Sequence, residues 1–358
     1  MDIIKICNDF SIAGEFSHYK VITTGNINTT YKVVTTDENG RHQYLIQKIN
    51  KNVFSRPDNI MENIMRVNEY IDNLNKTTDL IILHFIKSKK DQPFVIDDDG
   101  NFWRACKFFD CDCYNTTDDL QVIEEAGRAF GEFQYLLSDF DASSLYITIP
   151  DFHNTKKRIQ TLERTIKYAL SDRKEESKEE IDYILANKKT GELLCDLLER
   201  GELPLRVTHN DTKCNNVIFK KDLKKALAVI DLDTIMPGLC CYDFGDGARS
   251  ICSMTEEDEV DLTKVGFNLD KFESFTKGYF KYLKNSITQT EKDTFAVSVY
   301  IMTLELASRF LQDYLNGDTY FKVSMKKHNL IRTRCQIALC KDIYSKLDKM
   351  NEIVKKYT

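Results

Sequence analysis

A short polar loop between two apolar segments is the feature of this sequence that most limits how the chain can fold. The stretch 207–219 has the sequence VTHNDTKCNNVIF, in which His209, Asp211 and Asn216 form the pattern H-x-D-x-x-x-x-N. A second apolar run begins at Ala226 and ends at Asp231. The two runs predict a β-hairpin, so the polar side chains beside them should be held on a rigid scaffold.

The residue types in this loop suit phosphoryl transfer. That reaction needs a carboxylate that orients the attacking hydroxyl and accepts its proton, and oxygen ligands that hold Mg²⁺ across the phosphates. Asp211 suits the first role, and Asn216 and Asp231 suit the second. Asp and Asn also close turns in many proteins, so the loop alone leaves both interpretations open. The following hairpin, together with Lys48 on an upstream strand, favours catalysis.

The order of predicted elements divides the chain into two parts. Strands are expected at 19–23, 31–36, 44–49, 94–96 and 102–109, with a helix from Pro57. Beyond Asp110 the pattern becomes helical, with helices expected at 120–138, 192–199, 271–283, 292–314 and 331–357. We therefore expect an α+β protein with a small β-rich N-terminal lobe, residues 1–109, and a larger, mainly helical C-terminal lobe, residues 110–358. Gly127 and Gly131 lie four residues apart and indicate close packing against another helix.

Charge and composition exclude several classes of partner. The formal net charge of −6 argues against a general nucleic-acid binder. No apolar run approaches the roughly 18 residues of a membrane span, and the first residues lack the layout of a secretory signal. The eleven cysteines are odd in number and widely spread, which favours free thiols in a reducing cytoplasm. Zinc is not favoured, because no CxxC pair is present.

Beyond the polar loop, several stretches carry a family resemblance. The loop resembles the catalytic core of the aminoglycoside phosphotransferase/choline kinase-like enzymes, which are relatives of protein kinases. Five stretches, at 149–155, 208–216, 230–238, 242–246 and 309–321, are similar to bacterial N-acetylhexosamine 1-kinases. The resemblance covers nearly the whole chain. It implies a bilobal protein-kinase-like fold and transfer of the γ-phosphoryl group of ATP to the C1 hydroxyl of an N-acetylhexosamine (GlcNAc or GalNAc).

The resemblance also implies roles for single residues. Asp211 matches the catalytic Asp, and Asn216 and Asp231 match the Mg²⁺ ligands. Lys48 matches the strand lysine that contacts the α- and β-phosphates. Its carboxylate partner is expected on the helix from Pro57, where Glu62 is slightly preferred to Glu69.

Nucleotide contacts are expected at two further places. The segment 25–30 has a single glycine where protein kinases have several, so Gly25, Asn28 and Thr29 should cover the phosphates with backbone and side-chain donors. Phe109 and Asp110 lie where the lobes should join, and the backbone there should meet the adenine.

The acceptor site is less sharply marked. Besides Asp211, the expected sugar ligands are Asp233, Arg309, Tyr320 and Asn154. Asp233 is expected on the same strand face as Asp231, and Arg309 could instead form a structural ion pair. His153 and Asn154 could also cap loops.

Three neighbouring residues are expected to support the catalytic loop. Asp243 begins an Asp-Phe-Gly triplet, which is the metal-binding motif of protein kinases. It lies thirty-two residues after Asp211, whereas Asp231 comes just after the loop, where the metal ligand is expected in chain order. Asp243 and Asp246 are therefore expected to brace the loop. His209 should do the same through hydrogen bonds. Cys214 lies inside the loop, and Cys111 and Cys113 near the join of the lobes, so thiol alkylation should inhibit and ATP·Mg²⁺ should protect.

Two alternatives stay open. The first is the same chemistry on another small alcohol, such as an aminoglycoside, choline or homoserine. The second is an inactive nucleotide-binding regulator. No obligate protein partner is implied.

Overall fold

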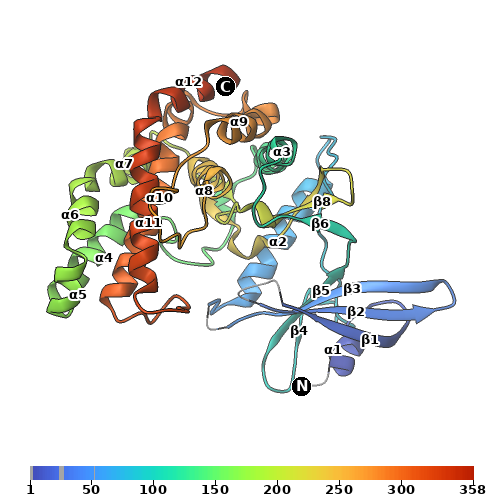
Figure 1. The fold of residues 1–358 in the computed structure, drawn as a ribbon. Coiled ribbons are helices and arrows are strands. Elements are labelled where there is room, and N and C mark those ends of the chain that lie inside the picture. The colour runs from blue at the N-terminus through green and yellow to red at the C-terminus, as the bar shows by residue number, and fades with distance from the viewer. Residues whose placement is uncertain (1–2, 24–27, 52) are drawn as a thin grey trace.

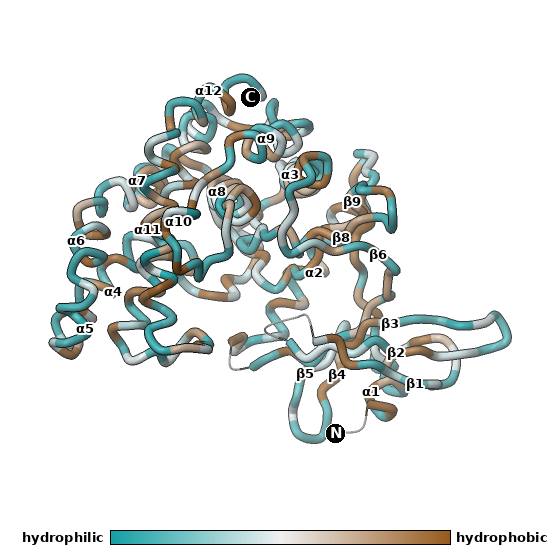
Figure 2. Tube along the Cα trace, in the orientation of Figure 1, coloured by the Kyte–Doolittle hydropathy of each residue, from teal (hydrophilic) through white to brown (hydrophobic). Residues whose placement is uncertain are grey.

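In the computed structural model, which describes residues 3–23, 28–51 and 53–358, a β-sheet lobe is joined to a larger helical lobe (Figure 1). The sheet has five antiparallel strands in the order β1-β2-β3-β5-β4. Their bounds are β1 Glu15–Ile22, β2 Thr29–Asp37, β3 Gly40–Lys48, β4 Val95–Ile96 and β5 Phe102–Lys107. Gly40, with φ +115°, closes the β2–β3 hairpin, whose far end is hydrophilic (Figure 2). The α+β fold class predicted from the sequence is confirmed.

Helix α1 (Ile3–Asp9) covers one face of this sheet. Ile3 and Ile6 pack with Val33, Ile46 and Trp103 in a core that belongs to the small lobe. Helix α2 (Pro57–Asp72) begins with Pro57, a favoured first helical residue because its missing N–H would have no partner there. The buried residues of α2 belong to the core of the large lobe, so this helix connects the two lobes.

The large lobe is built mainly from helices. Their bounds are α3 Leu120–Leu136, α4 Thr155–Tyr168, α5 Ser171–Glu176, α6 Lys178–Ala186, α7 Lys188–Glu199, α8 Cys240–Cys252, α9 Leu269–Leu283, α10 Gln289–Leu315, α11 His328–Ser345 and α12 Leu347–Tyr357. Short strands form a three-stranded sheet, β6 Cys111–Cys113, β8 Val217–Lys220 and β9 Lys225–Val229, and a pair, β7 Arg206–Thr208 and β10 Met236–Gly238. Single turns of 3₁₀ helix lie at Ala142–Ser144, Cys214–Asn216 and Leu232–Thr234.

The predicted close packing of α3 is confirmed. A Cβ atom on Gly127 would lie 2.2 Å from the carbonyl oxygen of Phe275, and one on Gly131 would lie 1.8 Å from that of Tyr279. Both carbonyls belong to α9, so only glycine allows the two helices to come this close.

Several predicted boundaries are wrong. The helix expected at 331–357 is two helices, α11 and α12, separated at Lys346. Helices α1, α4, α6 and α8 were not predicted. Of these, α1 has only seven residues, α4 is mostly polar and α8 contains two glycines. Within the described residues, α10 alone is long and apolar enough to cross a membrane by length and composition, and 83% of its apolar window is buried inside the protein. It is therefore the core helix of the large lobe.

Candidate active site

The structure brings Asp211 and Asn216 into direct contact. The loop that holds them follows β7 and ends in the 3₁₀ turn before β8. The Asn216 amide donates to a carboxylate oxygen of Asp211 over 3.0 Å and to the Asp211 backbone carbonyl over 2.7 Å. The Lys213 ammonium lies 2.8 Å from the other carboxylate oxygen. Because the Asn216 amide nitrogen is used here, its side-chain oxygen stays available for a metal ion.

His209 supports this loop as expected. Its Nδ1 accepts the backbone N–H of Asp211 over 3.2 Å, and its Nε2 lies 2.8 Å from the carbonyl oxygen of Ile230. One neutral tautomer, protonated on Nε2, satisfies both contacts. The ring therefore ties the backbone of Asp211 to the residue before Asp231, and a role as general base is not needed.

Asp243 braces the same loop from the first turn of α8. Its carboxylate accepts the backbone N–H groups of His209 and Asn210, each over 2.8 Å, and the amide of Gln134 over 2.6 Å. Burial raises the pKa of Asp243, while these donors act in the opposite direction. The bracing also holds Asn210 in a left-handed conformation, with φ 65°. The Asp-Phe-Gly triplet is thus part of a helix in this chain.

Asp246 lies one turn further along α8. It forms a 2.9 Å ion pair with Arg249. Burial would raise its pKa, but the charges of Arg249 and Lys213 lower it. Its support of the catalytic loop is electrostatic, through Lys213, and no hydrogen bond to the loop backbone is found in the described part of the chain.

Asp231 lies beyond the end of β9 in a left-handed conformation, with φ 62° and ψ 51°. Desolvation by surrounding protein, with the charge of Asp233 added, raises its pKa to about 6. Asp231 is nevertheless exposed to solvent, and the solvent makes this increase in its pKa smaller. Asp211 acts in the same direction, and a cation placed between these carboxylates would relieve the repulsion. The oxygen donors present therefore fit Mg²⁺. No group of three His, Cys, Asp or Glu residues converges among the described residues, so a metal ion here would have Asp231 and Asn216 as its protein ligands.

The expectation that Asp233 lies on a strand face with Asp231 is wrong. The strand ends at Val229, and residues 232–234 form a 3₁₀ turn. This turn directs Asp233 toward the small lobe, where it forms a buried ion pair with Arg104 of β5. Its second oxygen accepts the Asn28 amide over 2.8 Å. Since both oxygens are used and the residue is 3% exposed, this arrangement does not support a sugar contact.

Lys48 is the last residue of β3. Strand register pairs it with Thr29 on one side and Trp103 on the other, and its ammonium lies 5.9 Å from the Trp103 ring. Within the described residues Lys48 forms no ion pair. The carboxylate of Glu62 instead pairs with Arg66 at 2.5 Å, so its pairing with Lys48 stays a prediction. Gly25 lies outside the described residues.

The join between the lobes has an apolar floor. Phe109 packs with Ile218, Leu227 and Ala228, and Asp110 forms an exposed ion pair with Lys221 at 3.0 Å. The expectation that Cys214 is an accessible thiol is wrong, since it is 2% exposed and burial raises its pKa to about 12. Cys113 is exposed and is the better target for alkylation.

Three of the expected acceptor residues, Arg309, Tyr320 and Asn154, lie in or near α10 and α4. Among the described residues Arg309 forms no ion pair, and its guanidinium lies 5.9 Å from the ring centre of Phe152 and 5.6 Å from that of Phe321. Tyr320 is 73% exposed. Asn154 is the N-cap of α4, where its side-chain oxygen accepts the Lys157 N–H over 3.0 Å. Its role as a sugar ligand stays a prediction.

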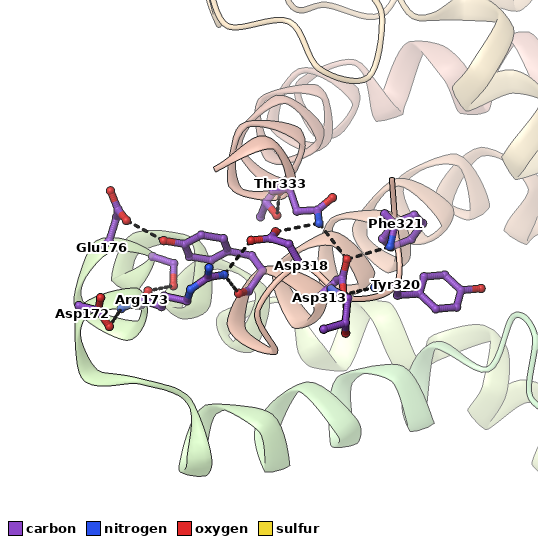
Figure 3. Close-up of polar contacts among 12 residues, drawn as sticks. Asp172, Arg173, Glu176, Asp313, Asp318, Tyr320, Phe321 and Thr333 are labelled. Atoms are coloured by element: carbon purple, nitrogen blue, oxygen red, sulfur yellow. Dashed lines mark hydrogen bonds and ion pairs between the residues drawn. The ribbon is translucent and has the colours of Figure 1, made fainter. Parts of the chain in front are cut away.

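Asp313 fixes the segment that carries Tyr320 and Phe321. Its buried carboxylate accepts the successive backbone N–H groups of Thr319, Tyr320 and Phe321 over 2.8–2.9 Å (Figure 3). Asp318 joins the same network through Asn329 and Arg173. This anchoring places Phe321 against Phe310, with ring centres 4.7 Å apart, and beside Arg309.

Sequence reasoning missed several residues that hold the site together. They are Arg104, Arg158, Glu305 and Asp313. Each is a charged residue in a stretch without a recognisable motif. Only Glu305 and Asp313 could have been noticed in the sequence, because an acidic residue inside a long apolar helix needs a partner.

Comparisons with known proteins agree with this fold. The fold is similar to that of an aminoglycoside phosphotransferase from Alicyclobacillus acidocaldarius, with a TM-score of 0.61 and 11% identity over 98% of this chain and 96% of that chain. It is also similar to a spectinomycin phosphotransferase solved with ADP and spectinomycin, with a TM-score of 0.56 and 11% identity over 97% and 98% of the two chains. A choline kinase from Cryptosporidium parvum gives a TM-score of 0.56 and 15% identity over 99% and 98%.

At these identities the solved structures show the fold. The family is shown by a sequence model described as the phosphotransferase enzyme family, which matches residues 18–272 and so includes Lys48, Asp211, Asn216 and Asp231. With the contacts of the catalytic loop in place, we conclude that the chain belongs to the phosphotransferase enzyme family.

Proposed function

We propose that this phosphotransferase moves the γ-phosphoryl group of ATP to the C1 hydroxyl of an N-acetylhexosamine. The observation that carries the proposal is the contact of Asp211 with Asn216 on a loop that His209 ties to the residue before Asp231. Asp211 would orient the sugar hydroxyl and accept its proton as the new O–P bond forms and the bond to ADP breaks.

The residues of this chain have separate tasks in that reaction. Lys213, paired with Asp211, stays charged because the Asp211 and Asp246 carboxylates raise its pKa against the effect of burial. It can therefore stabilise negative charge next to the attacking oxygen. Lys48 would contact the α- and β-phosphates. Mg²⁺, held by Asn216 and Asp231, would supply charge neutralisation between the phosphates. ADP in the similar spectinomycin phosphotransferase supports ATP as the co-substrate.

The acceptor assignment has two supports. The first is the resemblance of the five stretches to N-acetylhexosamine 1-kinases. The second is Arg309, a guanidinium without a carboxylate partner in the described part of the chain, between two aromatic rings. Planar donors and aromatic faces suit a sugar. An aminoglycoside or choline carries positive charge and would favour carboxylates instead. The odd number and wide spread of the cysteines favour a reducing compartment, and we include a cytoplasmic location in the proposal.

Substitution of Asp211 tests the catalytic role. Asp211→Ala should lower kcat by roughly 10²–10⁴-fold, because the hydroxyl is no longer oriented or deprotonated, while ATP affinity changes little. ADP release is measured with N-acetylhexosamines, hexoses, aminoglycosides, choline and homoserine, with and without Mg²⁺. Turnover within about tenfold of the wild type, a change of only some 1.4 kcal/mol, would refute the assignment.

A matched pair of amides tests the metal site. Asn216→Ala should raise the Mg²⁺ concentration needed for half-maximal turnover. Asn215→Ala is the control, since the Asn215 amide lies next to Asn216 in sequence but donates to Asn115. Equal Mg²⁺ requirements for the two variants would argue against Asn216 as a ligand. Activity on choline or an aminoglycoside, and not on any N-acetylhexosamine, would replace the proposed acceptor. No turnover of any acceptor would revive the inactive regulator.

A further inference from the structure

Two arginines lie on either part of Phe152, one against its carbonyl oxygen and one against its ring. Arg158 extends from α4 and Arg309 from α10. Burial and the nearby charge of Arg309 lower the pKa of Arg158, and the charges of Glu305 and Asp151 oppose this only in part. In the described part of the chain neither guanidinium forms an ion pair. Like charges that act on each other are costly to hold together unless an electron-rich group lies between them or against them.

Hydrogen bonding leaves Arg158 incompletely satisfied. One terminal nitrogen donates to the carbonyl oxygen of Phe152 over 3.1 Å. Its Nε is buried and has no hydrogen-bond partner among the described residues. A buried donor without an acceptor costs roughly 1–3 kcal/mol, so such groups in folded proteins usually face a ligand or an ordered water.

The nearby carboxylates are already used by other groups. The two oxygens of Glu305 contact His153 Nδ1 at 3.0 Å and the Thr155 hydroxyl at 2.7 Å. Asp151 pairs with Lys157 at 2.8 Å. Glu305 and Asp151 therefore balance the charge of the two arginines only in part, because each carboxylate is paired with another group.

A short chain of contacts connects this region to the reacting atoms. Phe152, whose carbonyl binds Arg158 and whose ring faces Arg309, precedes His153. His153 Nε2 lies 3.0 Å from the carbonyl oxygen of Asn210, the residue before Asp211. Arg309 also lies against Phe321, which Asp313 holds in place (Figure 3). The two guanidiniums therefore border the place where the acceptor should bind.

We propose that Arg158 and Arg309 form one subsite of the acceptor pocket, the paired-guanidinium subsite, which binds an uncharged oxygen-rich group and rejects an ammonium group. The proposal rests on the proposed function and adds a specificity residue, Arg158. For a hexosamine the group would be the acetamido carbonyl, whose oxygen accepts from a guanidinium. Glucosamine instead presents an ammonium, which the two cations repel. The subsite would thus select N-acetylated sugars partly by excluding the free amines.

The test compares N-acetylglucosamine with glucosamine in Arg158→Gln and Arg158→Lys. In Arg158→Gln we expect KM for N-acetylglucosamine to rise about tenfold, kcat and KM for ATP to stay within about twofold, and the kcat/KM preference for the N-acetylated sugar to fall at least about tenfold. Arg158→Lys keeps the charge but not the planar fork. It should raise KM for N-acetylglucosamine and still reject glucosamine, which a merely structural role would not produce.

Arg164→Gln is the matched control. Arg164 is an exposed arginine on the same helix, and it borders a hollow of about 510 Å³ that contains none of the site residues. Its removal should change neither KM nor the preference. Thermal unfolding of all variants shows whether each is folded, and a poorly folded Arg158→Gln leaves the decision to Arg158→Lys.

The outcomes separate the two proposals. A preference that stays within about twofold in Arg158→Gln, or that collapses equally in Arg158→Lys, overturns the subsite. Wild-type activity on other neutral alcohols but on no hexosamine overturns the proposed acceptor. The subsite is then tested with matched pairs of a free amine and its N-acetyl derivative, and a preference for the amine in each pair would overturn it too.

Discussion

At the scale of single residues, the buried pair of His153 and Glu305 shows how the catalytic loop depends on charge. His153 Nδ1 faces a Glu305 oxygen and Nε2 faces a backbone carbonyl, so both nitrogens face acceptors. Only the doubly protonated imidazolium can donate to both. Burial opposes this charge, but Glu305 outweighs it and raises the pKa of His153. Through the same contact, Glu305 has its pKa lowered against the effect of burial.

This pair predicts a pH-dependent contribution to stability. For a raised His pKa, the contribution is complete below the unfolded value of about 6.5 and is lost as the pH rises through the folded value. For the lowered Glu305 pKa, it is present above about 4.3 and lost as the pH falls through the folded value. The difference in melting temperature between the wild type and His153→Gln should therefore be largest near pH 5–6 and shrink on the alkaline side. A difference that is constant from pH 5 to 9 would show that His153 is not charged in the folded protein.

At the scale of elements, the contact between α3 and α9 depends on glycines that touch backbone. Gly131→Ala would place a Cβ 1.8 Å from the Tyr279 carbonyl oxygen, and the helices would have to separate. We expect a loss of stability of about 3 kcal/mol or more, since backbone cannot move aside as a side chain does. Urea unfolding measures this loss.

Gly191→Ala is the control for that substitution. Gly191 is also a helical glycine, but its new Cβ would meet the flexible ends of Ile159 and Leu304, each at 3.1 Å. A small rearrangement relieves this contact, and alanine is the better helix former by about 1 kcal/mol. The effect should be below about 1 kcal/mol in either direction. Similar losses in both variants would mean that the helix contact is looser than the structure shows.

The sequence predicts an element well when neighbouring residues determine it, and poorly when residues distant in sequence do. The catalytic loop, the β8–β9 hairpin and α2 follow from local patterns, because polar side chains, apolar runs and proline act over a few residues. The partner of Asp233 does not follow, because Arg104 is distant in sequence and reaches it only through the joining of the lobes. The same holds for Arg158 and Arg309, whose proximity depends on how α4 crosses α10. Local periodicity also fails for Asp233, since one left-handed residue, Asp231, ends the strand alternation.

At the scale of the whole molecule, a buried ion pair joins the two lobes beside Asp231, the proposed metal ligand. Arg104 on β5 is 2% exposed and Asp233 is 3% exposed. Arg104 also donates to Gln47, the neighbour of Lys48, over 2.9 Å, and Asp233 holds Asn28. The pair therefore connects the strand that ends at Lys48, the segment before β2 and the turn after Asp231. We infer that it sets the position of Lys48 relative to Asp231.

Breaking this pair should affect both stability and nucleotide binding. Arg104→Gln leaves the Asp233 carboxylate buried without its cation, which costs about 3–5 kcal/mol. KM for ATP should rise as well, because the lobes lose their fixed relation. Asp233→Asn added to Arg104→Gln removes the unpaired charge, so the double variant should regain part of the stability but not the ATP affinity.

Arg128→Gln is the control. Arg128 pairs with Glu132 inside α3, and the two side chains are 4% and 3% exposed. Loss of this pair should lower stability and leave KM for ATP unchanged. If Arg104→Gln and Arg128→Gln alter KM for ATP equally, the Arg104–Asp233 pair has no specific role in positioning the lobes.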